Sequence, residues 1–239
     1  MIPKTIHYCW FGRGDMPQLA EDCIASWHKY MPDWEYKLWN EDNFDVQTVP
    51  YVKEAYDARK FAFVTDYVRL YALQTEGGVY MDTDVEVLKS LDDLMCLNAF
   101  TGYEGTKTMY PVTGIMASEV NGLWVTEQIH AYDDAHFLKP DGSFDLTTNC
   151  QRIYRLMLNN GFVPNGGKKH QYKDLTIYPV DFFCPRQSTG EFLLTDNTYC
   201  DHHFMGSWSG ELDGKSSFAK IIGAKNMTRL IKLKRKLFG

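Results

Sequence analysis

Apolar and polar residues recur with strand and helix periods along the first third of the chain. Residues 6–11 and 34–39 are apolar or alternating and predict strands, whereas residues 17–30 and 52–61 carry apolar residues at helical spacing. Strands that alternate with helices are typical of a parallel α/β sheet, in which ligands bind outside the carboxyl ends of the strands.

The next stretch repeats this pattern with a denser set of polar groups. Residues 62–76 have apolar side chains at helical spacing, and Asp66 and Arg69 are three residues apart. That spacing lets both side chains project from one face of the expected helix. The pair Gly77-Gly78 is expected to end the helix, because glycine adopts the left-handed capping conformation without a Cβ penalty.

A short apolar strand, residues 79–81, is expected to lead directly into Asp82-Thr83-Asp84. Asp82 and Asp84 are two residues apart, so in an extended backbone both carboxylates point to the same side. Two such carboxylates repel each other unless a cation lies between them, and Mg²⁺ or Mn²⁺ binds carboxylates together with phosphate oxygens and water. The pattern predicts a metal that holds a diphosphate, although an isolated Asp-x-Asp triplet is more often a solvated loop.

The later part of the chain predicts further strands and helices with longer loops between them. The expected strands are residues 100–103, 112–117 and 177–183, the first two of them paired with each other, and the expected helices are residues 124–138 and 153–158. Residues 139–150 are predicted to form a loop, because proline, glycine and polar residues interrupt the pattern there.

A second polar cluster, residues 199–208, carries the adjacent histidines His202 and His203 directly after Asp201. Neighbouring histidines with an acid beside them can bind a metal or a phosphate group. On the residues alone, a structural role for this histidine pair is the more common one.

Together these segments resemble glycosyltransferase family 32, the DXD-containing transferases common in capsule and cell-surface polysaccharide synthesis, and the glucosylating domains of large clostridial toxins. The resemblance is carried by Asp66, Arg69, Gly77-Gly78-Val79-Tyr80, Asp82-Thr83-Asp84, the opening residues 2–12 and the late segment His203-Phe204-Met205-Gly206-Ser207-Trp208. It implies an α/β fold of the GT-A type, with a mixed, mainly parallel central sheet, over residues 1–213. It also implies a metal-dependent, retaining transfer of a hexose from a nucleotide sugar to a saccharide or lipid-linked acceptor.

The resemblance further implies a role for each polar group. Asp82 and Asp84 would bind Mn²⁺ or Mg²⁺, and His203 would face the metal or the diphosphate. Asp66 would hold sugar hydroxyls, and Arg69 would contact the sugar or the diphosphate. The residues implied to contact the donor are Trp10, Asn43, Tyr80, Asp82, Asp84, Ser207 and Trp208. Trp10 resembles a uracil-stacking residue and therefore favours a UDP-sugar, and the last two residues belong to a flexible lid.

Several of these residues have structural alternatives. Asp66 and Arg69 alternatively form a plain salt bridge. Trp10 is alternatively a core residue beside a turn, and Asn43 a residue of a polar turn or a helix cap. The toxin-like relatives carry an acid at the position of His203, so a metal bond from this residue is less secure than one from Asp84.

Two other functions remain open at the level of sequence. A metal-dependent nucleotide-sugar hydrolase would need a base beside the metal, for which Glu86 or His203 are candidates. A non-catalytic carbohydrate-binding module would have a degenerate site, and the intact Asp66, Arg69 and DXD triplet count against it. Thr148-Asn149 stands where relatives often carry a Gly-Pro segment, which leaves the acceptor side of the site open.

Composition agrees with a globular α/β protein. The 239 residues suit one domain with a large core, or one domain plus a small appendage. The 15 Tyr, 14 Phe and 6 Trp provide rings that fill cores and line carbohydrate or nucleobase sites. The 6 cysteines have no metal-binding spacing and predict reduced thiols in a cytoplasmic protein. We expect no signal peptide and no membrane-spanning helix.

Charge is distributed unevenly along the chain. The net charge is −6, yet residues 214–239 hold eight Lys or Arg and no acid, so the remainder carries 17 basic against 31 acidic residues. The acidic body argues against nucleic acid as a partner. The basic segment, residues 214–239, predicts an amphipathic helix on an anionic membrane surface, at the inner face of the plasma membrane. Its alternative is a terminal helix packed on the body.

Overall fold

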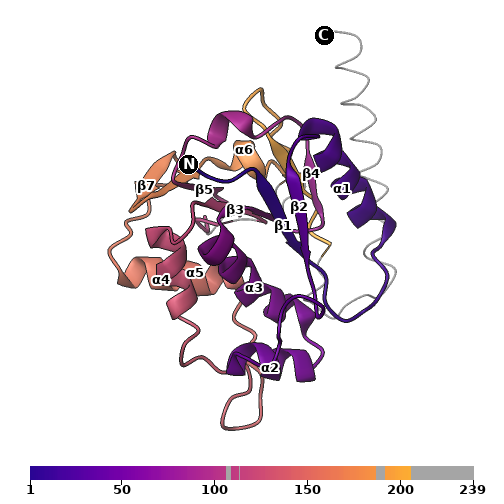
Figure 1. The fold of residues 1–239 in the computed structure, drawn as a ribbon. Coiled ribbons are helices and arrows are strands. Elements are labelled where there is room, and N and C mark those ends of the chain that lie inside the picture. The colour runs from indigo at the N-terminus through magenta and orange to yellow at the C-terminus, as the bar shows by residue number, and fades with distance from the viewer. Residues whose placement is uncertain (106–108, 113, 187–191, 206–239) are drawn as a thin grey trace. The chain divides into compact units, whose positions relative to one another are not determined.

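The structure is a computed structural model that describes residues 1–105, 109–112, 114–186 and 192–205 (Figure 1). The chain divides into two compact units, Met1–His203 and Phe204–Gly239. Of the second unit only Phe204 and Met205 are described. The predicted C-terminal helix and the predicted donor contacts Ser207 and Trp208 therefore lie outside the described residues, and the predicted division at residues 213 and 214 stays a prediction.

Strands and helices alternate as expected through the first part of the described chain. Later, several strands follow one another without a helix between them. The strands are β1 (Thr5–Cys9), β2 (Glu35–Trp39), β3 (Gly78–Met81), β4 (Val85–Val87), β5 (Ala99–Gly102), β6 (Ile115–Ser118), β7 (His170–Tyr172), β8 (Leu175–Tyr178) and β9 (Cys200–His202). The helices are α1 (Gln18–Tyr30), α2 (Pro50–Asp57), α3 (Phe61–Glu76), α4 (Leu123–His130), α5 (Asn149–Asn159) and α6 (Val180–Phe183), with a short 3-10 helix at Asp92–Leu94.

A seven-stranded sheet in the order β2-β1-β3-β6-β5-β8-β7 forms the centre of the first unit. The pairs β1–β2, β1–β3 and β5–β8 are parallel, whereas β3–β6, β5–β6 and β7–β8 are antiparallel. Five strands therefore run in one direction, and β6 and β7 run against them. This confirms the predicted α/β fold with a mixed, mainly parallel sheet. Strands β4 and β9 form a separate two-stranded sheet.

Alternation along the strands divides the core into two layers. In β3, Val79 and Met81 join one buried cluster together with Trp27 of α1 and Phe183 of α6, whereas Tyr80 joins the other. That other cluster takes its helical residues from α2, α3, α4 and α5. Figure 1 shows these four helices on one side of the sheet and α1 and α6 on the other.

The glycine pair ends α3 as predicted. The Gly77 amide donates to the Leu73 carbonyl at 3.0 Å, and Gly77 and Gly78 have φ angles of 66° and 101°. A Cβ at Gly78 would lie 2.6 Å from the Thr5 carbonyl oxygen, so only glycine lets β3 approach β1 this closely. The same pair therefore stops the helix and docks the strand that precedes the DXD triplet.

Two predicted elements are wrong at their ends. The helix expected over residues 124–138 stops at His130, although Tyr132 and Phe137 beyond it are buried. The strand expected over residues 177–183 ends at Tyr178, and the following residues form the short helix α6. In both places the apolar pattern indicates burial, which irregular backbone after His130 and a short helix after Tyr178 also provide.

Helix boundaries differ from prediction at two other places. The helix expected over residues 52–61 is α2, which ends at Asp57, and Arg59 then turns the chain with a φ of 56°. The helix expected over residues 153–158 begins earlier, at Asn149. The Thr148 hydroxyl accepts a hydrogen bond from the Gln151 amide in a capping box, so the predicted loop 139–150 ends in a helix cap.

The part of the chain that the structure describes offers no candidate for a membrane span. None of the helices among the described residues combines the length and the apolar character that crossing a bilayer requires.

Candidate active site

The DXD triplet occupies the turn between β3 and β4, at the carboxyl end of β3. The Asp82 amide donates to the Gly114 carbonyl at 2.8 Å, and the Val85 amide donates to the Asp82 carbonyl at 3.0 Å. Because β1, β2 and β3 are parallel, the residues that follow them lie at one edge of the sheet. The DXD triplet thus lies outside the carboxyl ends of these strands, where ligands bind in a parallel α/β sheet.

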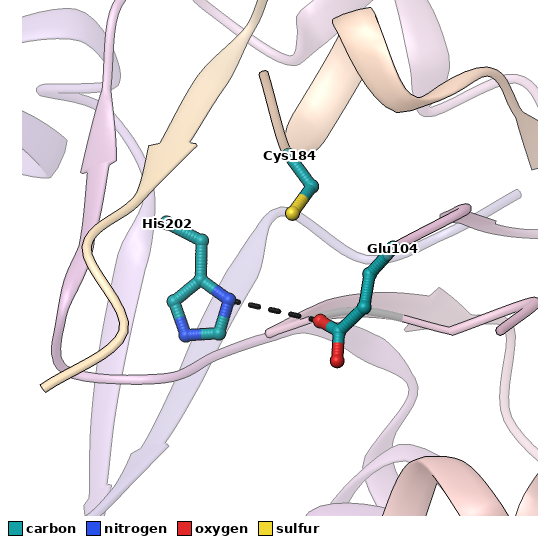
Figure 2. A group of neighbouring side chains, drawn as sticks. All are labelled: Glu104, Cys184 and His202. Atoms are coloured by element: carbon teal, nitrogen blue, oxygen red, sulfur yellow. Dashed lines mark ion pairs between the residues drawn. The ribbon is translucent and has the colours of Figure 1, made fainter. Parts of the chain in front are cut away.

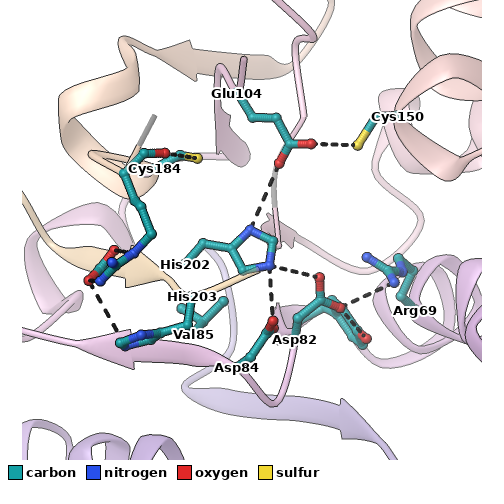
Figure 3. A network of polar contacts seen from close by, with 12 residues as sticks. Arg69, Asp82, Asp84, Val85, Glu104, Cys150, Cys184, His202 and His203 are labelled. Atoms are coloured by element: carbon teal, nitrogen blue, oxygen red, sulfur yellow. Dashed lines mark hydrogen bonds and ion pairs between the residues drawn. The ribbon is translucent and has the colours of Figure 1, made fainter. Parts of the chain in front are cut away.

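A late strand brings a histidine to this turn. Strand β9 pairs antiparallel with β4, with His202 opposite Val85. His202 Nε2 consequently lies 3.3 Å from Asp84 Oδ1 and 4.0 Å from Asp82 Oδ2 (Figure 3). One ligand atom of each of the three side chains lies within 4.8 Å of the others, close enough for the three to share one metal ion.

His203, for which the sequence predicted this position, belongs to a neighbouring cluster. Its Nε2 lies 3.2 Å from Glu86 Oε2 and 3.9 Å from Asp201 Oδ2. Arg186 also pairs with Asp201, its Nε lying 3.2 Å from Asp201 Oδ1. Successive side chains of an extended segment point to opposite sides, so only one histidine of the pair can face the DXD triplet. In the structure that residue is His202.

Arg69 joins the α3 acid to the DXD triplet. Its guanidinium Nη2 lies 3.4 Å from Asp66 Oδ1 and 3.2 Å from Asp82 Oδ1. The ion pair that was the structural alternative is therefore present, and the same guanidinium also reaches the DXD carboxylate. Asp66 and Arg69 are both buried.

Tyr80 supports Asp82 from the interior of the sheet. Its side chain is almost fully buried, its hydroxyl donates to Asp82 Oδ1 at 2.9 Å, and the Arg69 guanidinium lies 4.6 Å from its ring centre. Tyr80 and Arg69 together hold Oδ1 of Asp82, which leaves Oδ2 directed toward His202. In this structure Tyr80 orients a carboxylate, and its predicted contact with the donor stays a prediction.

Burial and neighbouring charges shift the pKa values of the central groups. Burial raises the pKa of Asp66 to about 7, an effect that Arg69 only partly offsets. For His202, burial alone lowers the pKa, but the carboxylates of Asp84 and Asp82 outweigh it and raise the pKa well above its ordinary value. When His202 is protonated, its positive charge lies beside the two aspartates, where a metal ion would otherwise neutralise them.

The predicted nucleoside-binding residues lie at the same edge of the sheet. Trp10 directly follows β1 and is half-buried, and its indole N–H donates to the Gly14 carbonyl at 2.6 Å. Asn43 uses both ends of its side-chain amide in the turn after β2: Oδ1 accepts from the Asn40 amide at 3.0 Å, and Nδ2 donates to the Leu38 carbonyl at 2.7 Å. This is the polar turn that was the alternative for Asn43, and the donor contacts of both residues stay predictions.

Three further residues near His202 were missed at the level of sequence. Glu104 Oε2 lies 3.9 Å from His202 Nδ1, and the Cys150 thiol donates to Glu104 Oε1 at 3.2 Å. Cys184 lies close to both Glu104 and His202. These residues come from different elements and have no common spacing, so the chain carried no local signal for them.

Comparison with known proteins agrees with the DXD assignment. Residues 17–101 match a family described as "Glycosyltransferase sugar-binding region containing DXD motif". The chain is 32% identical over 98 residues to inositol phosphoceramide mannosyltransferase 3 of Schizosaccharomyces pombe, which is 39% of this chain and 27% of that protein. It is 27% identical over 151 residues to the uncharacterized glycosyltransferase L373 of Acanthamoeba polyphaga mimivirus, 57% of this chain and 55% of the relative.

The solved structure of PaToxG glycosyltransferase is similar at 15% sequence identity and a TM-score of 0.47, over 67% of this chain and 70% of that one. The matched regions span about a quarter of the S. pombe mannosyltransferase and about half of the mimivirus glycosyltransferase. The segment from α1 to β5, which carries Asp66, Arg69 and the DXD triplet, is therefore similar to the DXD-containing sugar-binding region of glycosyltransferases.

Proposed function

We propose that this protein is a metal-dependent glycosyltransferase that moves a hexose from a nucleotide sugar to a saccharide or lipid-linked acceptor. The observation that carries the proposal is the convergence of Asp82, Asp84 and His202 at the carboxyl end of β3. The family match over residues 17–101 supports the same reading, because it covers the DXD triplet together with Asp66 and Arg69.

The donor atoms suit a divalent cation. Two carboxylates and one imidazole form a mixed oxygen and nitrogen set, which Mn²⁺ accepts more readily than Mg²⁺, an ion that favours oxygen ligands. Asp82, Asp84 and His202 would hold the ion. When bound, such a cation supplies charge neutralisation at the diphosphate and acts as a Lewis acid while the glycosidic bond breaks.

The surrounding residues fix this donor set and offer contacts to the sugar. Arg69 and Tyr80 hold Asp82 Oδ1, so the carboxylate is oriented before any ligand arrives. Asp66 would accept hydrogen bonds from sugar hydroxyls when it is ionised and could also donate one when it is protonated, and Arg69 would contact the sugar or the diphosphate. With a pKa of about 7, Asp66 carries a proton in part of the molecules at neutral pH.

The finer features of the reaction rest on resemblance. Trp10 favours a UDP-sugar, and the family suggests a retaining stereochemical course and a place in surface polysaccharide synthesis. The relatives' names add mannose as a candidate sugar and an inositol-containing lipid as a candidate acceptor. A basic C-terminal segment would bring the protein to an anionic membrane surface from the cytoplasm.

The proposal is tested by turnover of a panel of UDP- and GDP-sugars with Mn²⁺, with and without acceptor glycans and inositol lipids. Transfer of the sugar that requires an acceptor and Mn²⁺ is the expected result. Release of the sugar to water alone, unaffected by any acceptor, would instead indicate a hydrolase. Binding without turnover would indicate a carbohydrate-binding module.

A further inference from the structure

A second group of metal-binding side chains lies on the other edge of the His202 ring. Figure 2 shows the carboxylate of Glu104 and the sulfur of Cys184 directed toward His202. Glu104 Oε2 lies 3.9 Å from His202 Nδ1, and one ligand atom of each of the three side chains lies within 4.8 Å of the others. The Nε2 edge of the same ring faces Asp84.

We propose that Glu104, Cys184 and His202 form a second cation site, for a thiophilic divalent ion such as Zn²⁺, which competes with the DXD site for the His202 ring. The existence of this second site does not depend on the proposed transferase activity. Only the competition rests on the proposed metal site at Asp82 and Asp84.

The choice of ion follows from the donor atoms. Thiolate, imidazole and carboxylate are all zinc ligands, whereas Mg²⁺ and Mn²⁺ favour oxygen ligands. Three protein ligands leave a fourth, tetrahedral position for water or another small ligand. The DXD site offers two carboxylates and no thiol. We therefore expect the second site to prefer soft ions such as Zn²⁺ and the DXD site to prefer harder ions such as Mn²⁺.

The surroundings of Glu104 prepare it for this role. Glu104 is 17% exposed at its side chain, and the Cys150 thiol donates to Oε1, which leaves Oε2 on the His202 side (Figure 3). A carboxylate removed from water in this way is stabilised by a nearby cation. Cys184 and His202 are buried, so these two ligands would hold a bound ion at a position with little access to water.

The chemistry of imidazole makes the two sites exclusive. A neutral imidazole has one nitrogen that accepts or ligates, and its other nitrogen carries a proton. An ion bound through Nδ1 at Glu104 and Cys184 leaves a proton on Nε2, which then donates toward Asp84. His202 can therefore complete either the second site or the DXD site, and a thiophilic ion should weaken Mn²⁺ binding without touching Asp82 or Asp84.

The first experiment is titration of the metal-free protein with Co²⁺, which reports sulfur ligation through a thiolate-to-cobalt absorption band in the near ultraviolet. We expect the band in the wild type and its loss in Cys184→Ser. Cys200→Ser removes a buried thiol from the same strand as His202, and Cys96→Ser removes an exposed one, and both should keep the band. Absence of the band in the wild type, or its persistence in Cys184→Ser, would overturn the site.

X-ray absorption of the wild type loaded with one equivalent of Zn²⁺ tests the same claim without a variant that might misfold. One sulfur neighbour at about 2.3 Å is expected for a zinc-bound cysteine, and a shell of only oxygen and nitrogen would overturn the proposal.

The competition is measured as Mn²⁺ affinity, from the paramagnetic resonance signal of free Mn²⁺, with and without one equivalent of Zn²⁺. We expect Zn²⁺ to weaken Mn²⁺ binding about tenfold or more in the wild type, the scale of effect typical when support for a metal site is removed. In Cys184→Ser the effect of Zn²⁺ should largely disappear. Equal weakening of Mn²⁺ binding in both proteins would mean that Zn²⁺ enters the DXD site directly, and the proposed competition for the His202 ring would be contradicted.

Discussion

His202 Nε2 lies 3.3 Å from Asp84 Oδ1, although the two residues are far apart in the chain. The contact exists because β9 returns to pair with β4, the strand that directly follows the DXD turn. The first third of the chain builds the edge of the sheet, and a late strand supplies the third donor. The candidate metal site is therefore a product of tertiary structure more than of the DXD motif alone.

The two adjacent histidines should have different effects. We expect His202→Ala to weaken Mn²⁺ binding about 10- to 100-fold, because it removes a side chain that faces both aspartates. His203→Ala is the matched control, since His203 contacts Glu86 and Asp201 instead, and it should leave Mn²⁺ affinity within about twofold. Isothermal titration of each variant with Mn²⁺ measures both values. A larger loss in His203→Ala than in His202→Ala would reverse the assignment.

Tyr80→Phe should weaken the metal site without removing any ligand. The substitution deletes the hydroxyl that donates to Asp82 Oδ1 and keeps the buried ring. We expect about a tenfold loss in Mn²⁺ affinity, the lower end of the range for residues that orient metal ligands. Unfolding in urea should show a loss of about 1 kcal/mol, the typical net value of one hydrogen bond. An unchanged Mn²⁺ affinity would show that Asp82 needs no support from Tyr80.

Arg69 should matter for stability as well as for the site. Arg69→Met leaves the buried Asp66 and the half-buried Asp82 without their shared cation. Breaking a buried ion pair by removing one partner typically costs about 3–5 kcal/mol. The double variant Asp66→Asn/Arg69→Met should recover part of this loss, because it also removes the buried carboxyl group that has lost its ion-pair partner. Urea unfolding of the three proteins checks the prediction, which equal stability of the single variant and the wild type would contradict.

Asp66 should give the unfolding free energy a distinct pH dependence. Its pKa is about 7 in the folded protein and near 3.8 in an unfolded chain. Between these two pH values the folded state therefore holds a proton on Asp66 that the unfolded state has lost. The sign follows from linkage: this contribution to stability is complete below about pH 4 and is lost as pH rises through about 7. Asp66→Asn removes the titration.

The Asp66 prediction is measured as the difference in unfolding free energy between Asp66→Asn and the metal-free wild type. The difference should move in favour of the variant as pH rises from about 4 to about 7 and then level off. A difference that is constant with pH would mean that Asp66 titrates normally in the folded state.

The elements near the DXD triplet were predictable because their signals are local. Helical spacing located α3, the glycine pair marked its end, and the (i, i+3) spacing correctly joined Asp66 to Arg69. The parallel pairing of β1, β2 and β3 followed from the strand–helix alternation. Each of these inferences needs only a few neighbouring residues.

The remaining features depend on long-range pairing and could not be obtained in this way. The choice of His202 over His203 is fixed by the register of β9 on β4, which no local pattern specifies. Glu104 and Cys184 come from separate loops and meet only because the sheet brings them together. The overlong helix expected beyond His130 has a related cause, since Tyr132 and Phe137 are buried without being helical.

The most direct test of the account is binding of the preferred nucleotide sugar in the presence and absence of Mn²⁺, for the wild type and Asp84→Asn. Asp84 is buried beside His202, and asparagine has nearly the same size and shape as aspartate, so the amide variant should keep the fold. We predict that the wild type binds only with Mn²⁺ and that Asp84→Asn loses this dependence together with at least tenfold in affinity. Equal, metal-independent binding by both proteins would contradict a metal–diphosphate role for Asp82, Asp84 and His202.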